Sequence, residues 1–280
     1  MRVLEREKMQ NERDQLIKRI KLQLPDVSEL LEEIGSIVIE YPREDGKRKR
    51  IEKHVQDQLD EISRNRKLTN DERFRKFVFN CLYVQVTDAV ASRTLDALEQ
   101  RYKTCDVDSF VKVSSRELAS LMKESGYRFW STRSKTLMNI AKYLKDHFNG
   151  NMNEYFSYLK NNYEEDGLLS EHVGVSYKSR DWALSQFSPE YALVDVHVRN
   201  ALRSTGLILY SYLYGIPLST DRTTTEEYKH IRDLVSKLAE SLSWKPFKVV
   251  QYLWFFGREY CSKKNMCNRC KTKNCLSRLA

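Results

Sequence analysis

Residues 174–198 read GVSYKSRDWALSQFSPEYALVDVHV, and they place Lys178 seventeen positions before Asp195. With the preceding DGLLSEHV, this stretch predicts a helix, a tight turn at residues 172–176 and a second helix that starts near Tyr177. Such a turn exposes backbone N–H groups at a helix start, where an anion such as a phosphate can bind. An ordinary connection between helices is the alternative interpretation.

Lys178 falls in the first turn of the second predicted helix, where the helix dipole disfavours a cation. The lysine is therefore either exposed to solvent or used for chemistry. Partial burial and the dipole would favour the neutral, nucleophilic amine. Asp195 precedes the predicted helix VHVRNALRSTG and can cap it, and a capping aspartate can also face a substrate. Arg199 and Arg203 follow one helical turn apart, with either acids or phosphate as partners.

Outward from this stretch the pattern is helical. Asn70 is a predicted N-cap, Ser114 and Glu117 have capping-box spacing before a stop at Gly126, and residues 131–148 form a helix ended by Asn149 and Gly150. Few strands are credible, so the expected class is all-α. We predict three parts: a charged helical extension at 1–65, a helical domain at 66–190 and a second helical domain at 191–280.

The charge balance favours an anionic partner. The 280 residues carry 48 Lys and Arg against 39 Asp and Glu, a net charge of +9 that suits nucleic acid and, less often, a membrane surface. A basic protein without such a partner is the alternative. The run KRKR at 47–50 reads as a solvated helix start that could also touch phosphate. No segment resembles a signal peptide or a membrane span, so we expect an intracellular protein, in the cytoplasm or nucleoid.

Four cysteines near the C-terminus have the spacing C-x5-C-x2-C-x4-C, which is typical of a metal site. They are Cys261, Cys267, Cys270 and Cys275, and either zinc or a [4Fe–4S] cluster suits four thiolates. The cations between them could hold a phosphate backbone: Lys263, Lys264, Arg269, Lys271 and Lys273. Cys81 and Cys105 read as ordinary residues, and Trp254, Phe255 and Phe256 as core.

The elements GVSYK, SPEYALV and Asp195 resemble the catalytic segment of the helix-hairpin-helix (HhH-GPD) DNA glycosylase superfamily. The resemblance implies that Lys178 is the nucleophile that attacks the sugar of a flipped-out nucleotide, and that Asp195 assists departure of the base. Gly174 and Ser176 would contact DNA in the hairpin, although Ser176 replaces the glycine usual at its position.

Two further segments, GYRFWSTRSKTLMNIAKYL and YALVDVHVRNALRSTGLI, are similar to archaeal 8-oxoguanine glycosylases, and the resemblance spans residues 72–210. A third segment, FVFNCLYVQVTDAVASRTLDAL, resembles the family's early helix pair, which makes Gln85 a candidate to fill the gap left by the flipped base or to contact its partner. Phe129, Trp130 and Trp182 are candidates to line the base pocket, although each alone could be core. The cysteine array resembles that of endonuclease III with one residue fewer in each outer loop. An iron–sulfur cluster is therefore favoured over zinc.

The expected fold is all-α, with two helical domains of the HhH-GPD type, a cleft between them and a cysteine-ligated metal loop at the C-terminus. The expected activity is that of a bifunctional DNA glycosylase and AP lyase of base excision repair, acting as a monomer on damaged double-stranded DNA, with 8-oxoguanine as the favoured base. Two alternatives stay open: an endonuclease III-like enzyme for oxidised pyrimidines, and a non-catalytic, metal-stabilised DNA-binding protein.

Overall fold

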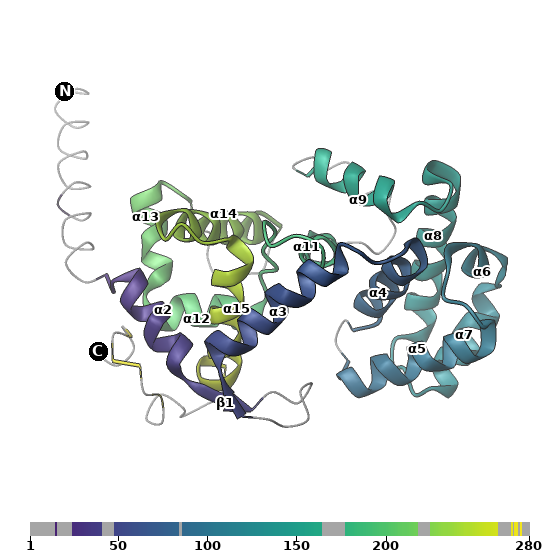
Figure 1. Ribbon diagram of the computed structural model, residues 1–280, viewed down its shortest axis with the longest axis horizontal. Coiled ribbons are helices and arrows are strands. Elements are labelled where there is room, and N and C mark those ends of the chain that lie inside the picture. Colours follow the sequence, from purple (N-terminus) through teal and green to yellow (C-terminus); the bar gives the residue numbers. More distant parts are fainter. Residues whose placement is uncertain are drawn as a thin grey trace, which may run out of the picture. The chain divides into compact units, whose positions relative to one another are not determined.

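The computed structural model describes residues 24–40, 48–83, 86–163, 177–217 and 225–262, together with the single residues 15, 270, 272, 273 and 275. Helices dominate these residues, and one two-stranded sheet joins them (Figure 1), which confirms the all-α class. The chain divides into two compact units. The terminal unit combines Met1–Asp60 with Pro189–Ala280, and the central unit is Glu61–Ser188.

This division differs from the expected domains at the N-terminus. Breaks near residues 60 and 189 lie close to the expected boundaries, but the described part of residues 1–60 belongs to the same unit as the C-terminal helices. Helix α3 (Ile51–Asn65) crosses the division, since its first ten residues lie in the terminal unit. The described residues of this N-terminal segment, 24–40 and 48–60, therefore belong to one compact unit with the C-terminal helices.

The central unit is built from helices that bury an aromatic core. Helix α8 (Trp130–Phe148) packs on α6 (Val107–Lys112) and α7 (Ser115–Glu124), while α4 (Asn70–Leu82) packs on α5 (Asp88–Tyr102) and α9 (Met152–Asn161). Helix α11 (Tyr177–Ser185) packs on α4 and α9. Phe74 meets Phe110 edge to face at 5.4 Å between ring centroids.

The predicted helix ends are mostly confirmed. Ser114 caps α7 by accepting the backbone N–H of Glu117 at 3.1 Å, and Gly126 has the left-handed φ of 83° that the stop requires. The prediction for α4 is wrong by one residue: Thr69 is the N-cap and forms a capping box with Glu72. The side chain of Asn70 instead bonds backbone atoms of Gly150 and Met152.

The terminal unit surrounds α15 (Pro246–Phe256), an almost wholly apolar helix. Figure 1 shows it among α2 (Val27–Ser36), α12 (Val196–Thr205) and α14 (Thr225–Ser241), and it contacts all three. Phe255 and Phe256 are buried, which confirms them as core. Shorter elements complete the unit: η2 (Leu207–Leu209), α13 (Tyr210–Tyr214) and η3 (Gly257–Cys261), a π-helical turn.

The run KRKR does not start a helix. Its last three residues form β2 (Arg48–Arg50), which pairs antiparallel with β1 (Val38–Glu40), and α3 begins only at Ile51. The backbone N–H of Ile51 donates to the carbonyl oxygen of Ile37 at 2.9 Å, which continues the link between the two segments. None of the helices within the described residues is long and apolar enough to cross a membrane.

Candidate functional site

Asp195 lies at the N-terminus of α12 and confirms the predicted helix cap. Its Oδ1 accepts backbone N–H groups from His197 at 2.8 Å and Val198 at 3.1 Å. Its Oδ2 accepts the indole N–H of Trp254 at 3.0 Å. Three N–H donors therefore hold this half-buried carboxylate in one orientation.

Trp254 is a candidate site residue that the sequence did not reveal, because its indole contacts Asp195. It lies on α15, 59 residues after Asp195 and only half-buried, so its description as plain core is incomplete. The guanidinium of Arg258 lies 4.9 Å from the centroid of its ring, and His197 meets the ring edge to face at 6.1 Å. No local pattern links a tryptophan to a carboxylate this far away in the chain, because the contact depends on how α15 packs on α12.

A close helix crossing fixes the start of α12. A Cβ on Gly257 would lie 2.0 Å from the carbonyl oxygen of His197, so only glycine fits where η3 meets α12. His197 Nδ1 lies 2.8 Å from the hydroxyl of Ser262, which also accepts a hydrogen bond from Asn200 at 3.1 Å. The histidine therefore has a structural contact.

Arg199 and Arg203 both reach the buried carboxylate of Glu227 on α14. Their guanidinium nitrogens lie 3.4 Å and 3.6 Å from Glu227 Oε1. This answers the question that the sequence left open, since acid pairing accounts for both arginines. The pairs tie the outer face of α12 to α14.

Lys178 is the second residue of α11 and is exposed, which is one of the two alternatives that its position in the sequence left open. Arg180 and Asp181 anchor the helix, since both side chains are fully buried and form an ion pair at 3.0 Å. Arg180 also donates to the carbonyl oxygen of Tyr163 and lies 3.9 Å from the centroid of that ring. Lys178 thus projects from a firmly anchored helix. It belongs to the central unit and Asp195 to the terminal unit.

The aromatic candidates for the base pocket are all half-buried. Trp182 meets the ring of Tyr83 edge to face at 5.0 Å. Phe129 and Trp130 lie at the start of α8. The Arg128 guanidinium lies 5.4 Å from the ring centroid of Phe129, and the Lys123 ammonium lies 5.4 Å from that of Trp130. In the described part of the chain, no ring contact joins Trp182 to either of them. Gly174, Ser176 and Gln85 lie outside the described residues.

Three of the four terminal cysteines are described. Cys261 is half-buried at the end of η3, and Cys270 and Cys275 are buried. The Cys275 thiol donates to the carbonyl oxygen of Ser204 at 3.1 Å. The described residues hold no group of three or more His, Cys, Asp or Glu that could bind a metal ion. The donor chemistry still fits a thiophilic metal, and Cys267 lies outside the described residues.

Of the cations between these cysteines, Lys273 is exposed and described, and its backbone N–H donates to Glu33 on α2 at 2.9 Å. Lys263, Lys264, Arg269 and Lys271 lie outside the described residues. Cys81 and Cys105 are buried, and burial raises the pKa of each thiol to about 12, as is usual for an ordinary structural cysteine.

Residues 54–244 match the family described as 8-oxoguanine DNA glycosylase. The chain belongs to this family. Lys178 and Asp195 both fall inside the matched segment of this 8-oxoguanine DNA glycosylase family member, while Trp254 and the four cysteines follow it. No curated protein sequence matches the chain.

Solved structures share the helix-hairpin-helix glycosylase fold. The Methanocaldococcus jannaschii 8-oxoguanine glycosylase/lyase in complex with a 15mer DNA containing 8-oxoguanine is 16% identical, with a TM-score of 0.54 over 76% of this chain and 93% of its own. The Thermotoga maritima 8-oxoguanine DNA glycosylase is 20% identical, with a TM-score of 0.53 over 85% and 100%. A trapped endonuclease III–DNA covalent intermediate is 18% identical, with a TM-score of 0.53 over 81% and 98%.

Proposed function

We propose that this protein is a bifunctional DNA glycosylase and AP lyase of base excision repair that removes an oxidised base, 8-oxoguanine above others, from double-stranded DNA. The observation that carries the proposal is the Asp195 carboxylate, which lies inside the segment that matches the family and is held by three N–H donors. Lys178, exposed on an anchored helix in the same segment, supplies the amine.

The reaction begins when the damaged nucleotide leaves the base stack, because an amine on the protein cannot reach the sugar inside a duplex. Deprotonated Lys178 Nζ forms a bond to C1′ as the bond from C1′ to the base breaks, and the electron pair leaves with the base. The charged form of Asp195 stabilises the positive charge that develops on the sugar. This role requires a carboxylate fixed before the reaction, which the Trp254 indole and the start of α12 provide.

The lyase step follows from the covalent link. After the sugar ring opens, Nζ and C1′ form a Schiff base, which acidifies the proton on C2′. Loss of that proton expels the 3′ phosphate, so the strand is cut by β-elimination. A single residue, Lys178, thus accounts for both activities.

DNA binding is supported by the net charge of +9 and by the terminal cysteine segment. We propose that Cys261, Cys267, Cys270 and Cys275 hold a [4Fe–4S] cluster, with zinc as the alternative. Bound there, the cluster would order the intervening segment and present Lys263, Lys264, Arg269, Lys271 and Lys273 to the phosphate backbone.

Borohydride trapping tests the mechanism. Duplexes that carry 8-oxoguanine, thymine glycol or an abasic site are incubated with the wild type, with Lys178→Ala and with Lys160→Ala, a matched loss of another exposed lysine of the central unit. We expect the wild type and Lys160→Ala to form a covalent complex, fastest on 8-oxoguanine, and Lys178→Ala to form none.

The same panel separates the alternatives. Faster trapping on thymine glycol would favour an enzyme for oxidised pyrimidines, which the fold likeness to endonuclease III keeps open. Binding of every duplex without any trapping would replace the lyase mechanism with a non-catalytic DNA-binding role. Trapping that survives in Lys178→Ala would assign the nucleophile to another amine.

A further inference from the structure

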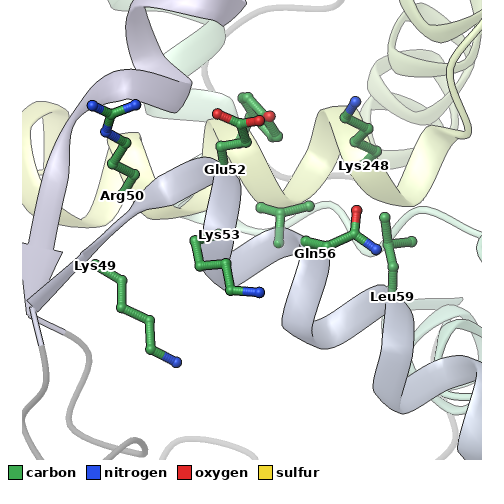
Figure 2. Close-up of a pocket in the computed structure, with 9 residues that line it drawn as sticks. Lys49, Arg50, Glu52, Lys53, Gln56, Leu59 and Lys248 are labelled. Carbon is green, nitrogen blue, oxygen red and sulfur yellow. The ribbon is translucent and has the colours of Figure 1, made fainter.

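The terminal unit contains a pocket of about 480 Å³ that the proposed reaction does not use. It lies among β2, the first turns of α3 and the middle of α15, so segments about 190 residues apart in the chain build its walls. Figure 2 shows Lys248 across the pocket from Lys49 and Lys53. The lining residues are Lys49, Arg50, Glu52, Lys53, Val55, Gln56, Leu59, Lys248 and Tyr252.

Cations outnumber acids around this pocket. Asp57 pairs with Lys49 at 2.8 Å and with Lys53 at 3.1 Å, and the hydrogen bond from Lys49 is the main cause that lowers the pKa of the Asp57 carboxyl. Arg50 and Lys248 form no ion pair in the part of the chain that the structure describes. Two of the four lining cations, Arg50 and Lys248, therefore have no ion-pair partner among the described residues, and the single lining acid, Glu52, acts on Lys248 through its charge.

The wall below Lys248 is aromatic and close-packed. The Lys248 ammonium lies 3.6 Å from the ring centroid of Trp244 and 5.9 Å from that of Tyr252, and burial lowers its pKa. Tyr252 is itself buried, and its ring leaves no room for a Cβ on Gly35, which would lie 2.7 Å away. An ammonium that has already lost part of its water gains more from a bound anion than an exposed one.

Every charged residue that lines the pocket lies outside the family match. The match covers residues 54–244, whereas Lys49, Arg50, Glu52, Lys53 and Lys248 precede or follow it. The charged lining of the pocket therefore comes from the segments that flank the match, while Val55, Gln56 and Leu59 lie inside it. Its chemistry does not follow from membership of the family.

We propose that this pocket binds the phosphate of a nucleotide, with Arg50 and Lys248 as the charged contacts and Gln56 and Glu52 facing the sugar or base. Arg50 offers the forked donor geometry that suits phosphate oxygens. The volume suits a ligand of mononucleotide size, since small-molecule sites span roughly 300–1,000 Å³. Either a free nucleotide or a nucleotide within a DNA strand could supply this phosphate.

The test compares three full-length proteins. The pocket variant is Arg50→Ala/Lys248→Met, which removes two charges and keeps the apolar stem of Lys248. The control variant is Lys237→Ala/Lys245→Ala, which removes two exposed charges of the same unit away from the pocket. Arg50→Ala alone, at an exposed position, serves if the double variant folds poorly.

Two measurements distinguish the sources of phosphate. Calorimetry with deoxyguanosine 5′-monophosphate should show binding to the wild type that inorganic phosphate competes for and that the pocket variant weakens at least tenfold. Fluorescence anisotropy with an undamaged duplex gives the slope of log affinity against log salt, which should fall by about 1 to 2 in the pocket variant if the DNA strand supplies the phosphate.

Weaker nucleotide binding in the pocket variant, but not in the control variant, supports a site for a free nucleotide. A smaller salt slope in the pocket variant, but not in the control variant, supports a site for a phosphate of the DNA strand. The proposal is overturned if the wild type binds no nucleotide and the two variants have the same salt slope. Neither measurement requires base excision, so the proposed phosphate site and the proposed glycosylase activity are tested independently of each other.

Discussion

The single aspartate at the start of α12 shows both what a sequence can reveal about a site and what it cannot. Its capping role was predictable, because an aspartate before an amphipathic helix accepts the first free N–H groups of that helix. Its third hydrogen bond was not, because the indole of Trp254 reaches it only through the packing of α15 on α12. Trp254 thus positions the carboxylate that the proposed reaction needs.

Trp254→Phe should slow base excision while leaving DNA affinity close to that of the wild type. The variant keeps an aromatic ring in place but removes the donor to Asp195 Oδ2, so the carboxylate is less firmly held. We expect single-turnover excision of 8-oxoguanine to fall about tenfold or more, and the free energy of unfolding to fall by about 1 kcal/mol, the typical net value of one hydrogen bond.

Trp244→Phe is the matched control, since Trp244 is another half-buried tryptophan of the terminal unit and makes no contact with Asp195. The positioning role is wrong if both variants lose excision activity in proportion to stability. A loss confined to substrate binding in Trp254→Phe would instead assign the ring to contact with DNA.

Lys178 illustrates a second limit at the residue scale. Its place in the first turn of a helix was predictable, but the sequence did not show that Lys178 is exposed while its neighbours Arg180 and Asp181 are buried. Adjacent opposite charges in a sequence usually indicate a solvated surface. Here the carbonyl oxygen of Tyr163 and the rings of Tyr163 and Tyr177 around Arg180 offset the cost of burying the charged pair. No local sequence pattern predicts these contacts.

At the scale of elements, the crossing of η3 over α12 connects the fold to the site. Gly257 allows the π-helical turn to touch the first turn of α12, beside the residue that Asp195 caps. A substitution at this crossing must therefore move the start of α12. Because Asp195 is fixed to that start, the chemistry should respond together with the stability.

Gly257→Ala should lower the free energy of unfolding by about 3 kcal/mol, at the upper end of the usual cost of overpacking, because its Cβ would meet a backbone oxygen at 2.0 Å. Gly215→Ala is the comparison: Gly215 has a φ of 67° but nothing within 4 Å of an added Cβ, so it should lose only about 1 to 2 kcal/mol. Urea unfolding measures both, and equal losses would show that η3 yields without cost.

The elements that sequence predicted best are those whose ends are marked locally. Ser114, Gly126 and the pair Asn149–Gly150 each act through the next few residues, and all three helix ends are confirmed. The two errors arose where neighbours compete or distant segments meet. Thr69 and not Asn70 is the N-cap of α4, because the capping box at Thr69 satisfies two backbone groups at once. The strand β2 forms because β1 pairs with it.

At the scale of the whole molecule, the terminal unit is assembled from both ends of the chain. Helix α2 packs on α15, more than 200 residues later, so the early segment completes a core that the late helices cannot close alone. Contiguous domains are the natural reading of a single sequence, and contacts over such separations leave no periodic signal within either segment. This explains why residues 1–65 were expected to form a helical extension and not part of the unit that the C-terminal helices build.

The terminal cysteine segment extends this assembly, which leads to a prediction about metal removal. Cys275 contacts the end of α12 through Ser204, and Lys273 contacts α2 through Glu33, so the segment touches early and late parts of one unit. A cluster on the four cysteines would lock both contacts at once. Its loss should therefore loosen the terminal unit and spare the central one, because no helix of the central unit carries any of its ligands.

We expect protein purified without oxygen to contain about four iron atoms per chain, as a [4Fe–4S] cluster has. After iron removal, or in Cys270→Ser, hydrogen exchange should rise in α2 and α12 and stay unchanged in α6 and α8. Cys105→Ala, which alters a buried thiol of the central unit, should keep its iron. One zinc atom per chain with the same exchange pattern would show that the metal is zinc, and it would still support a stabilising role confined to the terminal unit. Exchange that rises equally in both units would contradict it, because the segment would then not act through the terminal unit alone.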